Sequence, residues 1–275
     1  MSQIDDPSLI NEPEMDKVAA EFDVYPGIHR DDFIFHFHCN IPTVTREHAI
    51  NVYFRDGNRS SEQLHQLITK FHNSAQNRLS VLEFASGYGC VSRHLKKLCD
   101  QYRIVSCDIH EKAVKFLSTN IGLESVSSNK DPDKFRIGEK YDVVFALSFF
   151  SHMPHSTWGR WAGRLLNLVN DGGLLIFTTH GPRTLQHISN ATLKEEGYYF
   201  VPVSEQEDLP LEDYGTMIVT PYYVFDQMNK NQHAAPILFQ EAFWWGTQDT
   251  YVFGKNLCMT GTRGSGFSLA NVPLM

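Results

Sequence analysis

A turn of small residues at positions 85–89 is the first candidate for a ligand site. The chain enters it from an apolar run, 80–84, which reads as a buried strand and carries the acid Glu83. It leaves the turn in a helical pattern that starts at Val91. Glycine lets a ligand approach the backbone and a helix start offers free N–H groups, so this stretch predicts a ligand cradle. The small residues of the turn are Ala85, Ser86, Gly87 and Gly89.

A second acid supports this site. Residues 102–108 read as the next strand and end in Asp108, a carboxylate placed to accept both hydroxyls of a ribose. Two cofactor families use such a cradle, and the glycine spacing separates them. A dinucleotide fold requires G-x-G-x-x-G, whereas Ser92 stands where the third glycine would be.

Two motifs carry a resemblance to one family. Residues 83–89, Glu-Phe-Ala-Ser-Gly-Tyr-Gly, resemble motif I of the class I S-adenosylmethionine-dependent methyltransferases, an acid followed by x-G-x-G-x-G. Ala85 departs from that pattern because it occupies the first glycine position. Residues 141–148, with His-Met-Pro following at 152–154, are similar to motif IV of the same family. The resemblance covers residues 50–180 and implies S-adenosylmethionine as the cofactor.

The resemblance also implies roles for single residues. Ile109 is expected to pack on the adenine. Ser128, Asn129 or Asp131 is expected to bind the adenine amino group, although a plain turn explains that stretch equally well. Tyr53 and Arg55 are candidates for the methionine end, against internal packing and a surface ion pair respectively. The predicted cofactor-binding residues are Tyr53, Glu83, Ala85, Ser86, Gly87, Gly89, Asp108, Ile109, Ser128, Asn129 and Ser148.

One histidine is the candidate for catalysis. His152 follows the fourth predicted strand, beside the expected position of the methyl group, and a histidine side chain suits a general base. His180, after the fifth strand, is the second candidate. A base is needed only when the acceptor must lose a proton; otherwise alignment and exclusion of water carry methyl transfer. A purely structural role in its loop is the alternative for His152.

Strand and helix alternate with short loops around these motifs. This order predicts an α/β fold with a doubly wound, mostly parallel sheet. The resemblance implies the Rossmann-like form of this sheet, with seven strands, helices on both faces and an antiparallel final strand. We expect three parts. Residues 1–50 form an N-terminal arm or lid, residues 51–182 form the cofactor-binding core, and residues 183–275 form an aromatic-rich addition with a substrate cap, closing strands and a tail.

The periphery gives weaker patterns. Apolar residues alternate over 33–39, which predicts a strand. Ser60 or Ser61 is the predicted start of a helix that ends at Phe71. Residues 218–225 and 250–253 are expected to form the antiparallel edge pair. The aromatic residues between them and the core either roof the acceptor pocket or form the core of the addition.

A small cluster of nitrogen and sulfur side chains raises the question of a metal. His36, His38 and Cys39 lie together, and His29 is near in sequence. No second cluster at zinc-like spacing completes a tetrahedral set, so we expect these histidines on the less buried face of the segment and no metal.

Composition narrows the function classes. The 275 residues suffice for one domain with additions, and the net charge is −8 with no run of Lys and Arg, which disfavours a nucleic-acid partner. The apolar stretches are too short to span a membrane, and residues 1–6 lack the features of a secretion signal. Five scattered cysteines are expected to be free thiols in a reducing cytoplasm.

We therefore expect a methyltransferase that moves the methyl group of S-adenosylmethionine to oxygen or nitrogen of a small-molecule or glycan acceptor. A protein that binds the cofactor without turnover is the second hypothesis, suggested by Ala85. A nicotinamide-dependent oxidoreductase is the third, and the glycine spacing, Glu83 and the run 141–154 count against it.

Overall fold

A central sheet organises the molecule. The computed structural model describes residues 6–72, 78–188, 191–204, 206 and 208–257. The main path of the sheet has the order β10-β11-β7-β6-β3-β4-β5, in which only β10–β11 and β11–β7 are antiparallel. This confirms the predicted Rossmann-like sheet with an antiparallel final strand. The seven strands are β3 (Leu79–Phe84), β4 (Tyr102–Asp108), β5 (Glu124–Ser127), β6 (Tyr141–Ala146), β7 (Val169–His180), β10 (Ala234–Trp244) and β11 (Gln248–Lys255).

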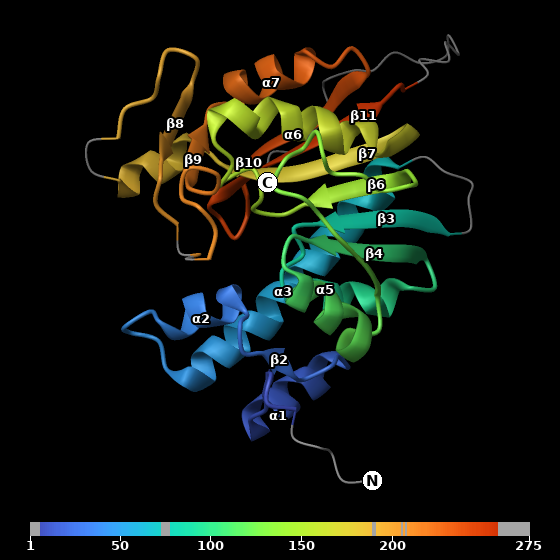
Figure 1. Cartoon of the computed structure of the whole chain (residues 1–275), viewed down its shortest axis with the longest axis vertical. Coiled ribbons are helices and arrows are strands. Elements are labelled where there is room, and N and C mark those ends of the chain that lie inside the picture. Colours follow the sequence, from blue (N-terminus) through green and yellow to red (C-terminus); the bar gives the residue numbers. More distant parts are fainter. Residues whose placement is uncertain (1–5, 73–77, 189–190, 205, 207, 258–275) are drawn as a thin grey trace, which may run out of the picture.

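Helices cover both faces of the sheet. Figure 1 shows α6 and α7 on one side and α3 and α5 on the other. Each side has its own apolar cluster, in which Trp158 of α6 and Leu67 of α3 are buried members. Parallel strands covered in this way are apolar at nearly every position, as β6 is. The covering elements are α3 (Arg46–Phe71), α4 (Ser92–Leu95), η1 (Lys96–Leu98), α5 (Glu111–Phe116), η2 (Leu117–Ile121), α6 (His155–Asn167) and α7 (Pro221–Asn229).

The N-terminal region forms a separate small layer below the carboxyl end of the sheet (Figure 1). It packs through a third apolar cluster that includes Phe35, Ile50 and Tyr53. Arg93 fastens this layer to the core, because its buried guanidinium donates to the carbonyl oxygens of Tyr25 at 2.9 Å and Gly27 at 3.1 Å. The elements of the layer are β1 (Leu9–Ile10), α1 (Pro13–Phe22), β2 (Ile28–His29), α2 (Phe33–Cys39) and the first turns of α3.

Two predictions for this region were wrong. Residues 33–39 form the helix α2 and not a strand, because the Asp32 side chain accepts the N–H of Phe35 and starts a helix. The helix that ends at Phe71 begins at Arg46, with Thr45 as its N-cap, and runs for 26 residues. Gly57 lies within α3 because it packs closely: a Cβ there would lie 2.1 Å from the carbonyl oxygen of Cys90.

The C-terminal addition also differs from expectation. The strand that forms the antiparallel edge pair with β11 is β10, and residues 218–225 divide between β9 (Thr216–Val219) and α7. Thr220 accepts the N–H of Tyr223 and Pro221 occupies the first helical turn, so the chain changes from strand to helix there. The remaining elements are η3 (Pro182–His187) and β8 (Tyr198–Val201), which pairs with β9. Within the described residues, no helix combines the length and apolar character needed to span a membrane.

Candidate functional site

A cavity of about 270 Å³ lies at the carboxyl ends of β3, β4 and β6. Ligands of open α/β sheets bind at this edge, where the strand order reverses. The cavity brings together most of the residues that the sequence singled out. Those that line it are Glu83, Ala85, Ser86, Gly87, Asp108, Ile109, Ser128, Asn129, Ser148 and His152.

The turn after β3 is built as a cradle. Ala85 has a φ of +58° and Gly87 one of +55°, both in the left-handed region. The Ser86 N–H donates to the carbonyl oxygen of Cys107 at 3.1 Å, and the Gly87 N–H donates to Asp108 Oδ2 at 2.8 Å. A Cβ on Gly87 would meet no atom within 4 Å, so the turn is open on the cavity side. Ala85 therefore departs from the glycine pattern at a position where the backbone favours glycine.

Two residues of the predicted cofactor-binding set, Gly89 and Tyr53, do not line the cavity. Gly89 is needed for packing: a Cβ there would lie 2.4 Å from Ile121 Cδ1 and 2.9 Å from Leu117 Cδ2. Tyr53 is fully buried inside α3, and its hydroxyl donates to Asp32 Oδ2 at 2.6 Å. The Tyr53 ring thus packs inside the N-terminal layer, as the alternative to a cofactor contact expected.

Glu83 is a buried acid beneath the turn. Its Oε2 accepts the hydroxyls of Ser92 at 2.5 Å and Ser106 at 3.2 Å. Burial raises the pKa of Glu83 to about 7, and the nearby charge of Asp108 contributes in the same direction. A carboxyl group with this pKa responds strongly to a cation placed in the cavity.

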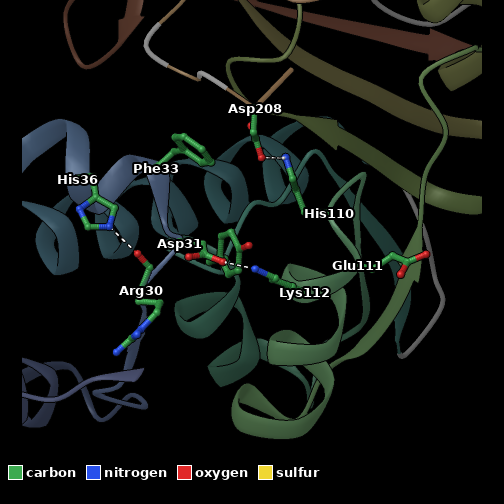
Figure 2. A pocket seen from close by; sticks show the side chains of 9 residues that line it. Arg30, Asp31, Phe33, His36, His110, Glu111, Lys112 and Asp208 are labelled. Atoms are coloured by element: carbon green, nitrogen blue, oxygen red, sulfur yellow. Dashed lines mark hydrogen bonds and ion pairs between the residues drawn. The ribbon is translucent and has the colours of Figure 1, made fainter. Parts of the chain in front are cut away.

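Asp108, at the end of β4, is held by its neighbours. Its Oδ1 accepts the backbone N–H of His110 at 2.9 Å and lies 2.7 Å from His110 Nδ1. The other ring nitrogen of His110 lies 3.0 Å from Asp208 Oδ2, and hydrogen bonding to Asp108 is the main reason that the pKa of His110 is raised. Figure 2 shows His110 and Asp208 at the edge of an adjoining hollow of about 540 Å³. Across that hollow, Asp31 of the N-terminal layer pairs with Lys112 of α5 at 2.8 Å.

Ser148, just after β6, is positioned by a buried hydrogen-bond network. Its φ is +57°, and its N–H donates to Thr178 Oγ1 at 2.8 Å. The Thr178 hydroxyl donates to Gln248 Oε1 at 2.5 Å, and Gln248 Nε2 donates to Ser148 Oγ at 2.8 Å. The network joins β6, β7 and β11, so the final strand helps to shape this end of the cavity.

His152 lies in the loop between β6 and α6, with 5 % of its surface exposed. Its Nδ1 lies 2.8 Å from the carbonyl oxygen of Gly215, and its ring stacks on Tyr214 with centroids 4.4 Å apart. Because a carbonyl only accepts, Nδ1 carries the proton and Nε2 holds the lone pair of the neutral ring. His180 does not line the cavity, and its ring centroid is 6.3 Å from that of His152.

The C-terminal addition contributes to the cavity wall. Tyr214 and Trp245 line it, whereas Tyr223 and Trp244 are buried in the apolar clusters. Some aromatic residues of the addition thus line the cavity, and others pack in the apolar clusters of the sheet. Sequence reasoning missed several lining residues, although Leu147 and Phe149 flank Ser148 in a motif it had singled out. The missed residues include Phe33, Ile34, Leu147, Phe149, Met153, Trp161, Leu209, Pro210 and Asp213.

The histidines near α2 do not gather into a metal site. His36 Nε2 lies 2.6 Å from the carbonyl oxygen of Arg30. Arg46 donates to Cys39 Sγ at 2.9 Å. Across the part of the chain that the structure describes, no three His, Cys, Asp or Glu side chains meet in a group that could hold an ion.

Comparison with known proteins agrees with this architecture. Residues 82–175 match the family described as "Methyltransferase domain". No curated protein matches the chain. Among solved structures, an S-adenosylmethionine-dependent methyltransferase from Clostridium acetobutylicum ATCC 824 is 13% identical, with 80% of this chain and 96% of that chain covered and a TM-score of 0.53.

Two further structures have the same fold. The magnesium protoporphyrin IX methyltransferase from Synechocystis PCC 6803, with bound S-adenosylmethionine, is 13% identical. The alignment covers 89% of this chain and 98% of that chain, with a TM-score of 0.52. A glycopeptide N-methyltransferase is 8% identical, with 72% and 90% covered and a TM-score of 0.51. At these identities the likeness concerns the fold.

The described residues fit S-adenosylmethionine. The turn leaves space above Gly87, and Asp108 lies at the strand end beside it. The indole nitrogen of Trp245, in the cavity wall, is buried without a hydrogen-bond partner among the described residues, so the wall has a donor to offer. Residues 82–175 thus match a methyltransferase domain, and the fold of the chain is the one that S-adenosylmethionine-dependent methyltransferases of known structure have.

Proposed function

We propose that this enzyme transfers the methyl group of S-adenosylmethionine to an oxygen or nitrogen atom of a small-molecule acceptor. The observation that carries the proposal is that one cavity has two kinds of lining residue. Turn residues and the acids Glu83 and Asp108 line it. His152 and the apolar and aromatic side chains of Leu209 and Tyr214 line the same cavity.

The proposed cofactor positions follow from the strand order. Asp108, at the end of β4, receives the ribose hydroxyls, and Ile109 with Ser128 and Asn129 surrounds the adenine. The turn 85–87 lies along the methionine part of the cofactor. The bound cofactor supplies an electrophilic methyl group on a sulfonium. The chain aligns the acceptor with it and excludes water, and the apolar walls serve both purposes.

His152 is the proposed general base for a hydroxyl acceptor. The Gly215 carbonyl fixes the proton on Nδ1, which leaves Nε2 as the basic nitrogen. His152→Asn places an amide donor at the Nδ1 position, where it can serve that carbonyl, and removes the base. For a hydroxyl acceptor we expect kcat to fall by roughly 10²-fold or more at neutral pH with KM little changed. For an amine acceptor that reacts as the free base, the variant keeps most of its activity.

The acceptor side supports a small molecule with an apolar or aromatic part. The cavity walls come from all three parts of the chain: Phe33 from the N-terminal arm, Phe149 from the core and Pro210 from the C-terminal addition. We propose that the arm and the addition together enclose the acceptor. A saccharide-like acceptor is the second candidate, supported by the polar groups of Asp213 and His152 in the same wall.

The first test is calorimetric titration of the whole chain with S-adenosylmethionine and S-adenosylhomocysteine, with NADH as the control. We expect micromolar binding of both adenosyl ligands, loss of binding in Asp108→Ala and no binding of NADH. A screen of small aromatic amines, phenols and free sugars with methyl-labelled cofactor then tests the acceptor class. If the adenosyl ligands bind and no acceptor in any class is methylated, the proposal of turnover fails and the non-catalytic binding protein replaces it.

A further inference from the structure

Backbone strain is concentrated around one cavity. Six non-glycine residues in the described part of the chain have a φ between +45° and +58°. Three of them, Ala85, Ser148 and Trp245, line the cofactor cavity and come from three separate elements. Such strain persists where a local conformation serves a ligand site. Trp245 is the residue of the three to which neither the motifs nor the cofactor assignment gives a role.

Trp245 occupies the tip of the hairpin between β10 and β11. Its φ is +54° and that of Gly246 is +72°, and the Thr247 N–H donates to the carbonyl oxygen of Trp244 at 3.0 Å. Hairpin tips with two successive positive φ angles favour Asn-Gly or Gly-Gly, because a bulky side chain is strained there. The chain has tryptophan at this position despite the strain, so we infer that the indole side chain has a role that asparagine or glycine could not fill.

The indole nitrogen of Trp245 lacks a partner. It is buried, and no acceptor among the described residues lies within hydrogen-bond distance. Other tryptophans of this protein are satisfied: Trp244 Nε1 donates to Ser60 Oγ at 2.9 Å, and Trp158 Nε1 donates to the carbonyl oxygen of Phe150 at 3.2 Å. A buried N–H without an acceptor is costly, so a ligand oxygen near it gains a strong hydrogen bond.

The position of the hairpin tip indicates which oxygen of the ligand accepts the indole N–H. The adenosine side of the cavity is marked by Asp108 on β4 and Ser128 beyond β5, at one end of the strand order. Trp245 precedes β11, on the other side of β6, and Gln248 of that strand donates to Ser148 at the end of β6. A cofactor whose adenosine occupies the first side extends its amino-acid end toward the second.

We propose that Trp245 is a cofactor-binding residue whose indole N–H donates to the carboxylate of the methionine part of S-adenosylmethionine. Glu83 and Asp32 line the same cavity and would repel a carboxylate, and the cation Lys130 follows β5 at the far side, so the ligand carboxylate needs a hydrogen-bond donor here. The strained tip holds the indole at the cavity wall. This inference rests on the cofactor assignment, and the experiment separates the two.

The test is calorimetric titration of the whole chain with S-adenosylhomocysteine and with 5′-methylthioadenosine, which lacks the amino-acid end. Trp245→Phe retains an aromatic ring and removes the N–H. We expect it to weaken S-adenosylhomocysteine binding by about tenfold or more, the effect of one hydrogen bond to a charged group. Binding of 5′-methylthioadenosine should stay within about twofold of the wild type, because that ligand has no carboxylate to lose.

Thermal unfolding supplies an independent measurement. Trp245→Asn relieves the backbone strain and also removes the packing of the ring against an apolar cluster, so its Tm reports the sum of both effects, while S-adenosylhomocysteine binding should weaken. The matched control is Ala242→Gly, which relieves a positive φ of 52° in the same hairpin outside the cavity. It should raise Tm and leave binding unchanged.

Two results would overturn the inference. One is a Trp245→Phe variant that binds S-adenosylhomocysteine as tightly as the wild type. The other is an equal loss for both ligands, which would mean that the ring shapes the cavity and the N–H contacts no carboxylate. If the wild-type chain binds neither ligand, the cofactor assignment itself is wrong, and that outcome is recognised before any variant is compared.

Discussion

Nδ1 of His110 lies 2.7 Å from Oδ1 of Asp108, so the carboxylate expected to hold the cofactor ribose is already oriented by a neighbouring side chain. The second nitrogen of the same ring lies 3.0 Å from Oδ2 of Asp208, in the C-terminal addition. One imidazole therefore links the cofactor-binding strand end to a segment that walls the cavity.

This link predicts a pH-dependent contribution to stability. The pKa of His110 is raised, chiefly by its hydrogen bond to Asp108 and further by Asp208. Its contribution is thus fully present below the unfolded value of about 6.5 and is lost as pH rises through the higher folded value. Urea unfolding of the wild type at pH 6.5 and 9 should reveal this loss, and Asp208→Asn should reduce it.

The expected size is small, under about 1 kcal/mol, because the Asp208 side chain is 45% exposed and solvent weakens such pairs. Glu212→Gln removes the same charge from a nearby exposed position and serves as the control. Parallel pH curves for wild type and Asp208→Asn would show that the pair contributes nothing.

Glu83 predicts proton release when the cofactor binds. Burial holds its pKa at about 7 in the absence of ligand, so the carboxyl group is partly protonated at pH 6.5. The sulfonium and ammonium groups of S-adenosylmethionine favour the ionised form and expel that proton. Calorimetry at pH 6.5 in two buffers of different ionisation enthalpy should show release of a fraction of a proton, absent in Glu83→Gln. Equal apparent enthalpies for the wild type in both buffers would contradict the prediction.

The same group has a cost in stability. A carboxyl group whose pKa rises on folding destabilises the native state as pH increases from the unfolded value of 4.5 to about 7, and the cost is fully present above that range. Glu83→Gln should therefore be more stable than the wild type at pH 8, by up to about 3 kcal/mol, while binding the cofactor less tightly. Denaturant midpoints at pH 4.5 and 8 measure the difference, which should be small at the lower pH.

His94 predicts sensitivity to acid. It is fully buried beside Phe22, and neither ring nitrogen has a hydrogen-bond partner among the described residues. Burial lowers its pKa from 6.5 to about 3. Between these values the unfolded chain binds a proton that the native chain excludes, so stability falls as pH falls.

At pH 5 the cost of His94 is about 2 kcal/mol by this linkage. His94→Leu should be more resistant to urea than the wild type at pH 5 and should lose the advantage at pH 8. His65→Leu is the control, because that histidine is only half-buried and is hydrogen-bonded to Tyr102. A constant difference between wild type and His94→Leu from pH 5 to 8 would assign the effect to packing alone.

The backbone conformation of Ala85 predicts that glycine at this position stabilises the protein. Its φ of +58° is unfavourable for a residue with a Cβ, so Ala85→Gly should stabilise the protein by about 1 kcal/mol. The cavity gains the volume of one methyl group, and binding of S-adenosylhomocysteine should be kept or tightened. Thermal unfolding and titration of one sample measure both. Weaker binding by the glycine variant would mean that the Ala85 methyl contacts the ligand.

The core of the fold was predictable because its signals are local. Asp108 ends an apolar strand, and residues 80–84 and 141–148 are apolar runs bounded by turns. The antiparallel last strand followed from the family resemblance and is confirmed. Packing overrode the local signal at Gly57, where glycine allows α3 to approach Cys90 and does not end the helix.

The candidate site was predictable where its residues belong to short motifs. The turn at 85–87, the strand end at Asp108 and the run that holds Ser148 and His152 are such motifs. Trp245 lies in the cavity wall and Gln248 donates to Ser148, but both are distant in sequence from the turn, and their residue types predict no role. The positive φ angles of Ser148 and Trp245 likewise belong to the folded backbone and cannot be predicted from the residue types.

Arg93 has a consequence for the engineering of acceptor preference. Its side chain ties the peptide carbonyls of the N-terminal layer to the helix that follows the cofactor turn. An arm grafted from another enzyme would leave this buried guanidinium without those two acceptors unless the graft recreated the path of the chain at Tyr25 and Gly27. The arm and the core are therefore one unit of exchange, and redesign of the acceptor pocket has more freedom in the C-terminal wall.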